Sequence, residues 1–169
     1  SFKRMTERLA ENETRTTAIM ESVVDGIITI SDMGIIEQFN SACCELFGYE
    51  AEEVIGQNIR MLMPEPDRSQ HDGYLAHFRE TGEKKIIGIG REVQGKRKDG
   101  SLFPLELGVT EVQLKSRRLF TGVLRDITAR KAAEKEREKL IEALQYSNDE
   151  LAHFAEILVH DLKAPVRSM

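Results

Sequence analysis

The feature that most constrains this chain is a change in composition after Ile127. Glycine and proline interrupt the earlier sequence repeatedly, but neither occurs from 129 to 162. Within that stretch, apolar residues step alternately by four and three with one polar exception: Leu140, Leu144, Ser147, Leu151, Phe154 and Leu158. This spacing is typical of the seam of a coiled coil. We therefore predict that residues 129–169 form a long helix in a parallel two-stranded coiled coil, with a single helix folded back on its domain as the alternative.

The start of the chain also has a helical pattern without Gly or Pro. Residues 2–24 carry apolar side chains at loosely helical intervals, at Phe2, Met5, Leu9, Ile19 and Val23. Because so polar a helix is marginal alone, we expect it to pack against a second copy or against its own domain. Residues 1–18 are assigned to this N-terminal segment, and a frayed terminus is the alternative.

The front of the region from 19 to 128 predicts a hairpin followed by short helices. Residues 26–32 and 35–40 are rich in β-branched side chains and are separated by a turn signal at Gly34. Asn40 is expected to cap a short helix that ends at Gly48. A second short helix is expected over 51–55, before the break at Leu62-Met63-Pro64.

A longer helix and a strand follow. The helix is expected to begin at Pro66-Asp67 and to stop near Gly82, and its spacing puts three side chains on one apolar face: His71, Leu75 and Phe78. From Lys85 the apolar period changes to two, which predicts a strand. Its two faces are expected to carry Ile87, Ile89, Arg91 and Val93 on one side, and Gly88 and Gly90 on the other.

Two further strands complete the predicted domain. A turn is expected at 98–100, and the following strand alternates cleanly, with Phe103, Leu105, Leu107 and Val109 pointing inward. Residues 119–127 predict the last strand. The result is one α+β domain over 19–128, with a five-stranded antiparallel sheet and short helices on one side.

Composition limits the class of protein. Of the 169 residues 40% are apolar, which is enough for a buried core, and no apolar run approaches the length of a membrane span. The polar start has no signal-peptide pattern and no initiating Met, so we expect a fragment of a cytoplasmic protein whose parent is free or membrane-tethered. The net charge of -5 argues against a nucleic-acid partner.

The only two cysteines, Cys43 and Cys44, are adjacent in sequence. They provide no disulfide framework and no structural zinc site, which favours a reduced compartment. We expect one to point inward from its short helix and the other to lie at the edge.

These motifs together resemble the PAS domain. The resemblance covers residues 19–128 and rests on the front segment 23–59, on RKDGSLFPLEL (97–107) and on GVLRDITARK (122–131). It implies the PAS fold and a sensory role. A flavin photosensor of the light-oxygen-voltage type is not expected, because the sequence around Cys43 and Cys44 does not match the reactive-cysteine run of that group.

The last residues, HDLKAPVR from His160 to Arg167, resemble the phospho-acceptor box of sensor histidine kinases. The resemblance implies ATP-dependent phosphorylation on His160, with Asp161 orienting the imidazole and accepting its proton. No ATP-binding motif occurs in this sequence, so ATP would bind only in a kinase domain outside it, and we expect this fragment to be inactive alone. The implied partners are a second copy of the chain and the receiver domain of a response regulator.

Within the PAS family the central stretch is most similar to the haem domain of the FixL-type rhizobial oxygen sensors. The matching segments are MPEPDRSQHDGYL, IIGIGREVQGKRKDG and FPLEL. The resemblance implies haem b with His71 as the proximal iron ligand. It also implies that Arg91 moves between a haem propionate and bound oxygen. Three distal apolar residues match Ile86, Leu107 and Val109.

Two positions depart from that pattern. His77 stands where a second propionate-contacting Arg is expected, and Lys85 stands where a His is expected, although either could still contact a propionate. Two hypotheses therefore remain. The first is a haem PAS domain that senses oxygen or another gas and controls a histidine kinase. The second is a cofactor-free PAS domain that serves as a dimerisation and relay module, with His71 and Arg91 in structural roles.

Overall fold

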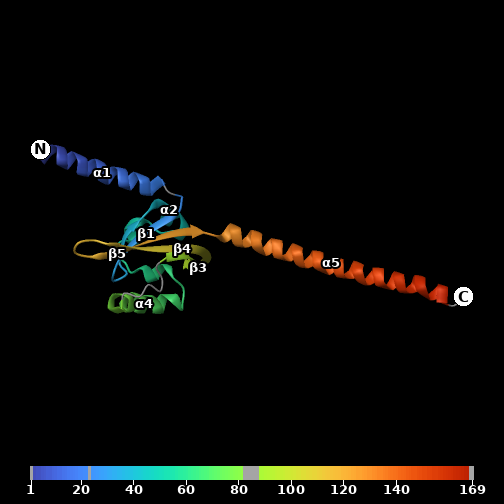
Figure 1. Ribbon diagram of the computed structural model, residues 1–169. Coiled ribbons are helices and arrows are strands. Elements are labelled where there is room, and N and C mark those ends of the chain that lie inside the picture. The colour runs from blue at the N-terminus through green and yellow to red at the C-terminus, as the bar shows by residue number, and fades with distance from the viewer. Residues whose placement is uncertain (1, 23, 82–87, 168–169) are drawn as a thin grey trace. The chain divides into compact units, whose positions relative to one another are not determined.

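The computed structural model describes residues 2–22, 24–81 and 88–167 (Figure 1). It divides into two compact units, Ser1–Thr128 and Ala129–Met169. Among the described residues, no helix combines the length and apolar character needed to cross a membrane.

A five-stranded antiparallel sheet forms the centre of the first unit. Its strands are β1 (Gly26–Ser31), β2 (Ile36–Phe39), β3 (Gly88–Lys96), β4 (Leu102–Gln113) and β5 (Arg118–Asp126). Their order across the sheet is β2-β1-β5-β4-β3, so β5 is central and β2 and β3 form the edges. Every neighbouring pair is antiparallel.

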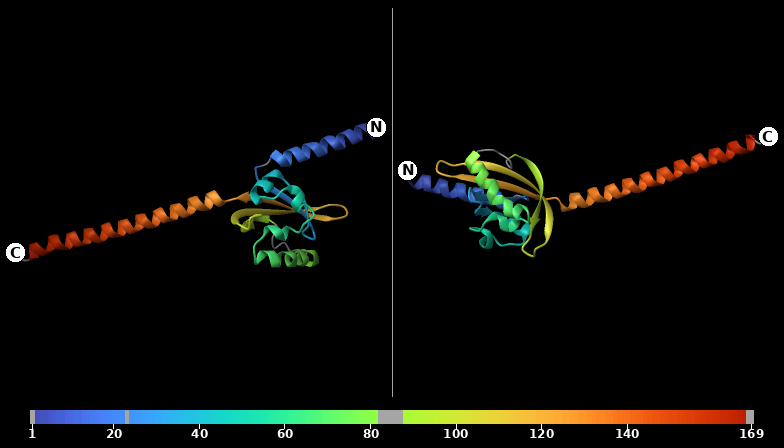
Figure 2. Two further views of the ribbon diagram at one scale, coloured as in Figure 1. Left: turned by 180° about the vertical axis from the view of Figure 1, so that it is seen from behind. Right: turned by 90° about the horizontal axis from the view of Figure 1, so that it is seen from below.

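The helices of this unit between β2 and β3 are short except for the last. They are α2 (Ser41–Phe47), α3 (Ala51–Val54), the 3-10 helix η1 (Ile59–Leu62) and α4 (Asp67–Thr81). In Figures 1 and 2 α4 lies over one face of the curved sheet. The predicted fold class, a five-stranded PAS-type sheet with helices on one side and a long C-terminal helix, is confirmed.

Asn40 ties the first hairpin to the first short helix. Its Oδ1 accepts hydrogen bonds from the backbone N–H groups of Cys43 at 3.1 Å and Ile27 at 2.9 Å. Its Nδ2 donates to the carbonyl of Asp25 at 3.1 Å. The helix ends at Gly48, whose φ of 75° is left-handed. The predicted cap and stop are both confirmed, because each depends on local chemistry.

The end of the core under α2 is filled by aromatic and sulfur side chains. The rings of Phe47 and Phe103 meet edge to face with centroids 5.4 Å apart, and the guanidinium of Arg97 lies 4.0 Å from the centre of the Phe103 ring. Cys43 is fully buried, which raises the pKa of its thiol to about 12, and Cys44 is half-buried. The predicted placement of the two cysteines is therefore confirmed.

The structure differs from the sequence prediction in two places. Strict alternation along β3 fails, because Gly88 pairs with Val109 and Arg91 with Leu107, which leaves one extra residue between them. The helix η1 was not predicted, since so short a 3-10 turn has no periodic signal. The expected helix stop at Gly82 lies outside the described residues.

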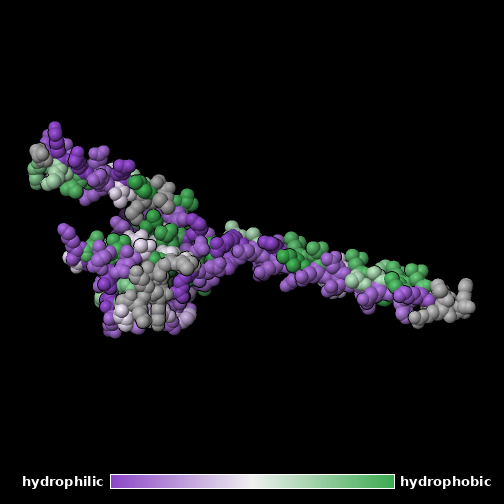
Figure 3. All heavy atoms as spheres, in the orientation of Figure 1, coloured by the Kyte–Doolittle hydropathy of each residue, from purple (hydrophilic) through white to green (hydrophobic). Residues whose placement is uncertain are grey.

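Two long helices flank the sheet domain in sequence. Helix α1 spans Phe2–Ser22 and α5 spans Thr128–Arg167, so each is one continuous helix over its described range. The boundary predicted after residue 18 falls inside α1 and stays a prediction. Both helices expose large apolar side chains, and in Figure 3 those of α5 gather along one side.

Candidate ligand pocket and relay helix

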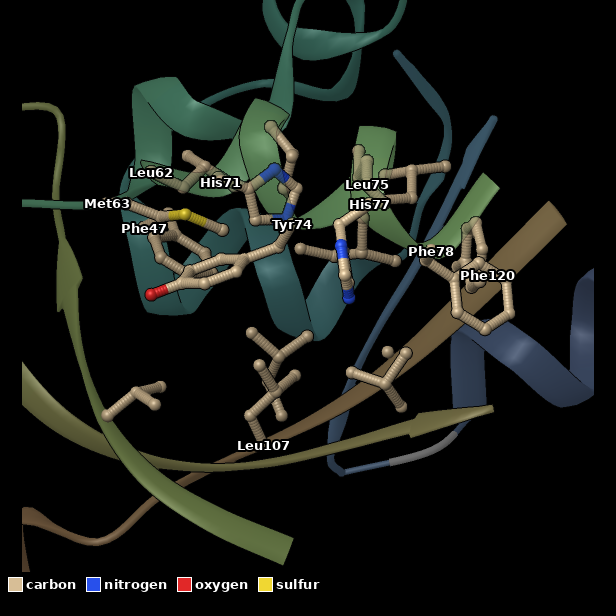
Figure 4. Close-up of a pocket in the computed structure, with 17 residues that line it drawn as sticks. Phe47, Leu62, Met63, His71, Tyr74, Leu75, His77, Phe78, Leu107 and Phe120 are labelled. Carbon is tan, nitrogen blue, oxygen red and sulfur yellow. The ribbon is translucent and has the colours of Figure 1, made fainter. Parts of the chain in front are cut away.

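An apolar cavity of about 150 Å³ lies between α4 and the sheet (Figure 4). The helix supplies one wall and the inward faces of β1, β3, β4 and β5 supply the other. The lining residues from α4 are His71, Tyr74, Leu75, His77 and Phe78. Those from the sheet are Ile28, Ile30, Val93, Leu107, Val109, Phe120, Gly122 and Leu124. Phe47, Ile59, Leu62 and Met63 close the remaining side. Such a lining suits a mostly apolar ligand held by a few polar groups.

His71 is one of the polar side chains that line this cavity from α4. Its Nδ1 is buried and has no hydrogen-bond partner among the described residues. Burial lowers the pKa of this imidazole below its usual 6.5, although the carboxylates of Asp72 and Asp67 act in the opposite direction. The side chain is therefore neutral at physiological pH, which is the form that ligates a metal.

The nearest carboxylate is held by other partners, which explains why it does not satisfy His71. Asp72 accepts a hydrogen bond from Nδ2 of Asn58 at 3.3 Å. It also forms an ion pair with the guanidinium of Arg60 at 2.7 Å. Both partners belong to the segment of η1. The packing of η1 against α4 thus leaves the imidazole without this acceptor.

The structure brings four of the predicted site residues together. His71 and His77 on α4 and Leu107 and Val109 on β4 all line the same cavity. The predicted apolar face of α4 is confirmed, because Leu75 and Phe78 are buried beside them. Ile86 and Lys85 lie outside the described residues.

Arg91 occupies a different position from these four. It pairs across the sheet with Leu107, so it belongs to the cavity-facing side of β3, but it is exposed and is not among the lining residues. Its β3 neighbour on the same face, Val93, does line the cavity. The sequence placed Arg91 on the correct face without showing how far along the edge strand it lies.

Sequence reasoning missed the cavity residues of β1 and β5. The alternation of Phe120, Gly122 and Leu124 was visible as a strand, and the glycine within it was a signal of close approach by a neighbour or ligand. Their convergence with α4 required the strand order, which places β5 at the centre of the sheet.

The exit from the sheet domain is fixed by Asp126. Its Oδ1 accepts hydrogen bonds from the N–H of Thr128 at 2.8 Å and from its hydroxyl, and so caps α5. Its Oδ2 lies 3.6 Å from the guanidinium of Arg97. Ile127 between them is buried, and its N–H donates to the carbonyl of Pro104 at 3.2 Å. Ile127, the residue directly before α5, is thereby joined to β4.

The predicted phospho-acceptor is an exposed residue of α5. The side chain of His160 is 85% exposed, and its Nδ1 lies 3.8 Å from a carboxylate oxygen of Asp161. The predicted seam residues Leu144, Leu151 and Phe154 are each more than half exposed on the single chain. His160 lies two positions past Leu158, so it is outside the predicted seam.

Comparison with known proteins supports the family. The family model of the PAS domain matches residues 24–129. Sensor protein FixL of Bradyrhizobium diazoefficiens is 38% identical over 169 residues, covering 99% of this chain and 34% of that protein. Oxygen sensor protein DosP of Escherichia coli is 32% identical over 127 residues, covering 75% of this chain and 16% of that protein.

A histidine kinase and a solved structure extend the comparison. The cell-division control histidine kinase PdhS of Brucella anthropi is 29% identical over 164 residues, covering 96% of this chain and 15% of that protein. The crystal structure of the PAS domain of an HTR-like protein from Haloarcula marismortui superposes with a TM-score of 0.62 at 27% identity. This match covers 74% of this chain and 99% of the other.

The chain belongs to the PAS domain family. The predicted similarity to FixL and to PAS-containing sensor histidine kinases is confirmed by these matches. The chain spans 34% of FixL and less of DosP and PdhS, so it corresponds to the PAS region and adjoining helices of larger relatives.

Proposed function

We propose that this chain is the sensor portion of a two-component histidine kinase, and that its PAS domain binds haem b through His71 and senses oxygen or another gas. The observation that carries this proposal is the buried, unpartnered Nδ1 of His71, on an imidazole that lines an apolar cavity. A relative named as an oxygen sensor, DosP, supports the same assignment.

The donor set fits a haem better than a metal ion bound by side chains alone. Among the described residues, no group of three or more His, Cys, Asp or Glu side chains could hold an ion. A metal at His71 therefore needs a prosthetic group to supply its other ligands, and the apolar walls suit a porphyrin. The bound iron would supply reversible gas binding.

The surrounding residues would tune that site. Leu107 and Val109 face the cavity from β4 and exclude water from its sheet side. His77 lines the same wall as His71 and could pair with a propionate, as could Lys85. Arg91 lies on the same face of the sheet. Its guanidinium could pair with a haem propionate in one state and donate a hydrogen bond to the bound gas in the other. Ile86 would complete the apolar distal set.

The output would pass through paired helices to His160. Seam residues of α5 and the apolar positions of α1 are exposed on one chain, and a second copy would bury both sets. His160 stays outside the seam, where ATP bound to a kinase domain and the receiver domain of a response regulator could reach it. Asp161 would orient the imidazole and take its proton.

The ligand assignment is tested by His71→Ala with His153→Ala as the matched control. His153 is an exposed histidine of α5, so its loss removes an imidazole without touching the cavity. We expect His71→Ala to abolish haem retention and His153→Ala to leave the Soret band unchanged. A His71→Ala protein that stays red with an unchanged spectrum would show that the ligand is wrong.

Dimerisation is tested separately by sedimentation equilibrium. We expect a dimer at concentrations on the order of tens of micromolar, because the sheet domain and α1 support the seam of α5. The substitution Leu151→Asp, at the centre of the seam, should shift the protein toward monomer. A monomeric unsubstituted protein at those concentrations would contradict the paired-helix arrangement.

A further inference from the structure

The floor of the cavity contains a glycine in the middle of the central strand. Gly122 pairs with Ile28 of β1 on one side and with Val109 of β4 on the other. Its neighbours on the same face of β5, Phe120 and Leu124, are both buried. Four apolar side chains, those of Ile28, Val109, Phe120 and Leu124, thus surround this glycine on the sheet.

The backbone does not explain this glycine. Gly122 is not among the glycines with positive φ, which are Gly34, Gly48, Gly56 and Gly100. An alanine or valine could adopt its extended conformation, and glycine within a strand is unfavourable because it packs nothing and loses more entropy on folding. The reason for glycine here is therefore space rather than conformation.

The side chain of Leu107 occupies the space beside Gly122. A Cβ built on Gly122 would lie 3.3 Å from Cδ1 of Leu107, and its next neighbour would be the carbonyl oxygen of Ile28 at 3.9 Å. Leu107 lies diagonally across from Gly122, two residues along β4 from Val109. Its side chain therefore rests over the bare backbone of Gly122 and leaves the cavity open between the sheet and α4.

We infer that Gly122 is a specificity-determining residue, because its missing side chain lets Leu107 lie against the sheet and so sets the room available opposite His71. A methyl group at position 122 would push Leu107 by a few tenths of an ångström toward α4 and would occupy part of the floor. The cavity would then admit smaller occupants only. This inference rests on the proposed function for the identity of the natural occupant, but the cavity can be probed without haem.

The test compares Gly122→Ala with Gly108→Ala on haem-free protein. Gly108 is the matched control: it lies on the neighbouring strand, and a Cβ there meets nothing within 4 Å. Benzene is titrated and followed in ¹³C spectra through the methyl signals of Leu124, which lines the same cavity and is present in every variant. We expect Gly122→Ala to weaken benzene binding by about fourfold, the change in affinity that corresponds to the burial of one methylene-sized group. Gly108→Ala should leave benzene binding unchanged.

A double variant keeps the test valid if Gly122→Ala folds poorly. Shortening the neighbour in Gly122→Ala/Leu107→Ala removes the close contact, so benzene binding should return at least to the unsubstituted level. The inference is overturned by equal binding in Gly122→Ala and unsubstituted protein, by equal loss in Gly108→Ala, or by an unsubstituted protein that binds no benzene.

Haem binding forms a separate arm of the experiment. If the unsubstituted protein takes up no haem, the proposed function fails, while the benzene result still decides the role of Gly122. If haem is taken up, Gly122→Ala should slow carbon monoxide association relative to Gly108→Ala. Unchanged association in that variant would also count against the inference.

Discussion

Glycine stands in different surroundings in the two halves of this sheet. At the α2 end, a Cβ on Gly95 would lie 2.7 Å from both Phe103 and Leu105, so the glycine makes room for a side chain that is already there. At the α4 end, a Cβ on Gly122 would meet Leu107 alone at close range, beside an open cavity. We call the close-packed part around Gly95, Phe103 and Leu105 the filled half, and it stabilises the fold. The part around Gly122 and the cavity is the hollow half, and it contains the candidate site. The difference predicts unequal responses to substitution.

The largest stability effect is expected in the filled half. Phe103 is 2% exposed and contacts the ring of Phe47, and Phe103→Ala should destabilise the domain by about 3–5 kcal/mol because it leaves a cavity in a close-packed region. Leu107→Ala in the hollow half should cost about 1–2 kcal/mol, since its side chain already borders empty space. Urea unfolding followed by tyrosine fluorescence measures both. Equal losses would contradict the division into two halves.

The next effect concerns the polar link between hairpin and helix. Asn40→Ala removes three hydrogen bonds of a side chain that is 2% exposed, and we expect a loss of about 2 kcal/mol. Asn40→Ser keeps a capping oxygen without introducing a charge, so it should cost less in the same urea experiment. If the two variants unfold at the same urea concentration, capping by Oδ1 is not the source of the stability.

A smaller effect of opposite sign is expected at His71 in haem-free protein. His71→Leu removes a buried group without a partner, so the domain should gain about 1 kcal/mol at neutral pH. Burial lowers the pKa of His71 below 6.5, so the unfolded chain binds the proton more readily than the folded one. Stability should therefore fall as the pH drops through and below 6.5.

The pH dependence supplies the control for that prediction. Because leucine does not titrate, the stability difference between His71→Leu and the unsubstituted protein should widen from pH 8 to pH 5.5. Unfolding free energies measured at the two pH values check this. A difference that stays constant or narrows would mean that His71 is not held neutral by burial.

The smallest effect is expected at the surface. Lys98 forms an ion pair with Glu53 at 2.5 Å, but both side chains are about half exposed to solvent. Water and salt screen such a pair, so Lys98→Ala should leave the unfolding midpoint unchanged within error. A clear loss of stability would show that the turn after β3 contributes to the filled half.

Local patterns predicted much of the fold and part of the site. The cap at Asn40, the stop at Gly48 and the shared face of His71, Leu75 and Phe78 all depend on residues a few positions apart. Their agreement with the structure follows from that short range. The continuous helix of α5 follows from the same short-range patterns, and its coiled-coil seam stays a prediction.

The remaining features depend on contacts between distant segments. The floor of the cavity comes from β1 and β5, whose adjacency is a property of the strand order. The extra residue between Gly88 and Arg91 is defined only by pairing with β4, and it changes which residues of β3 share a face. The alternation of apolar residues in the sequence could therefore locate neither the floor of the cavity nor the extra residue of β3.

The most direct test of the central claim is an absorption spectrum of the protein supplied with haem. It should be recorded in the ferric state, after reduction under nitrogen, and after exposure to air. We predict a strong Soret band that shifts on reduction and shifts again with oxygen, because the neutral His71 in its apolar cavity would hold the iron. A protein with no Soret band after reconstitution would contradict the account and leave a cofactor-free PAS relay in its place.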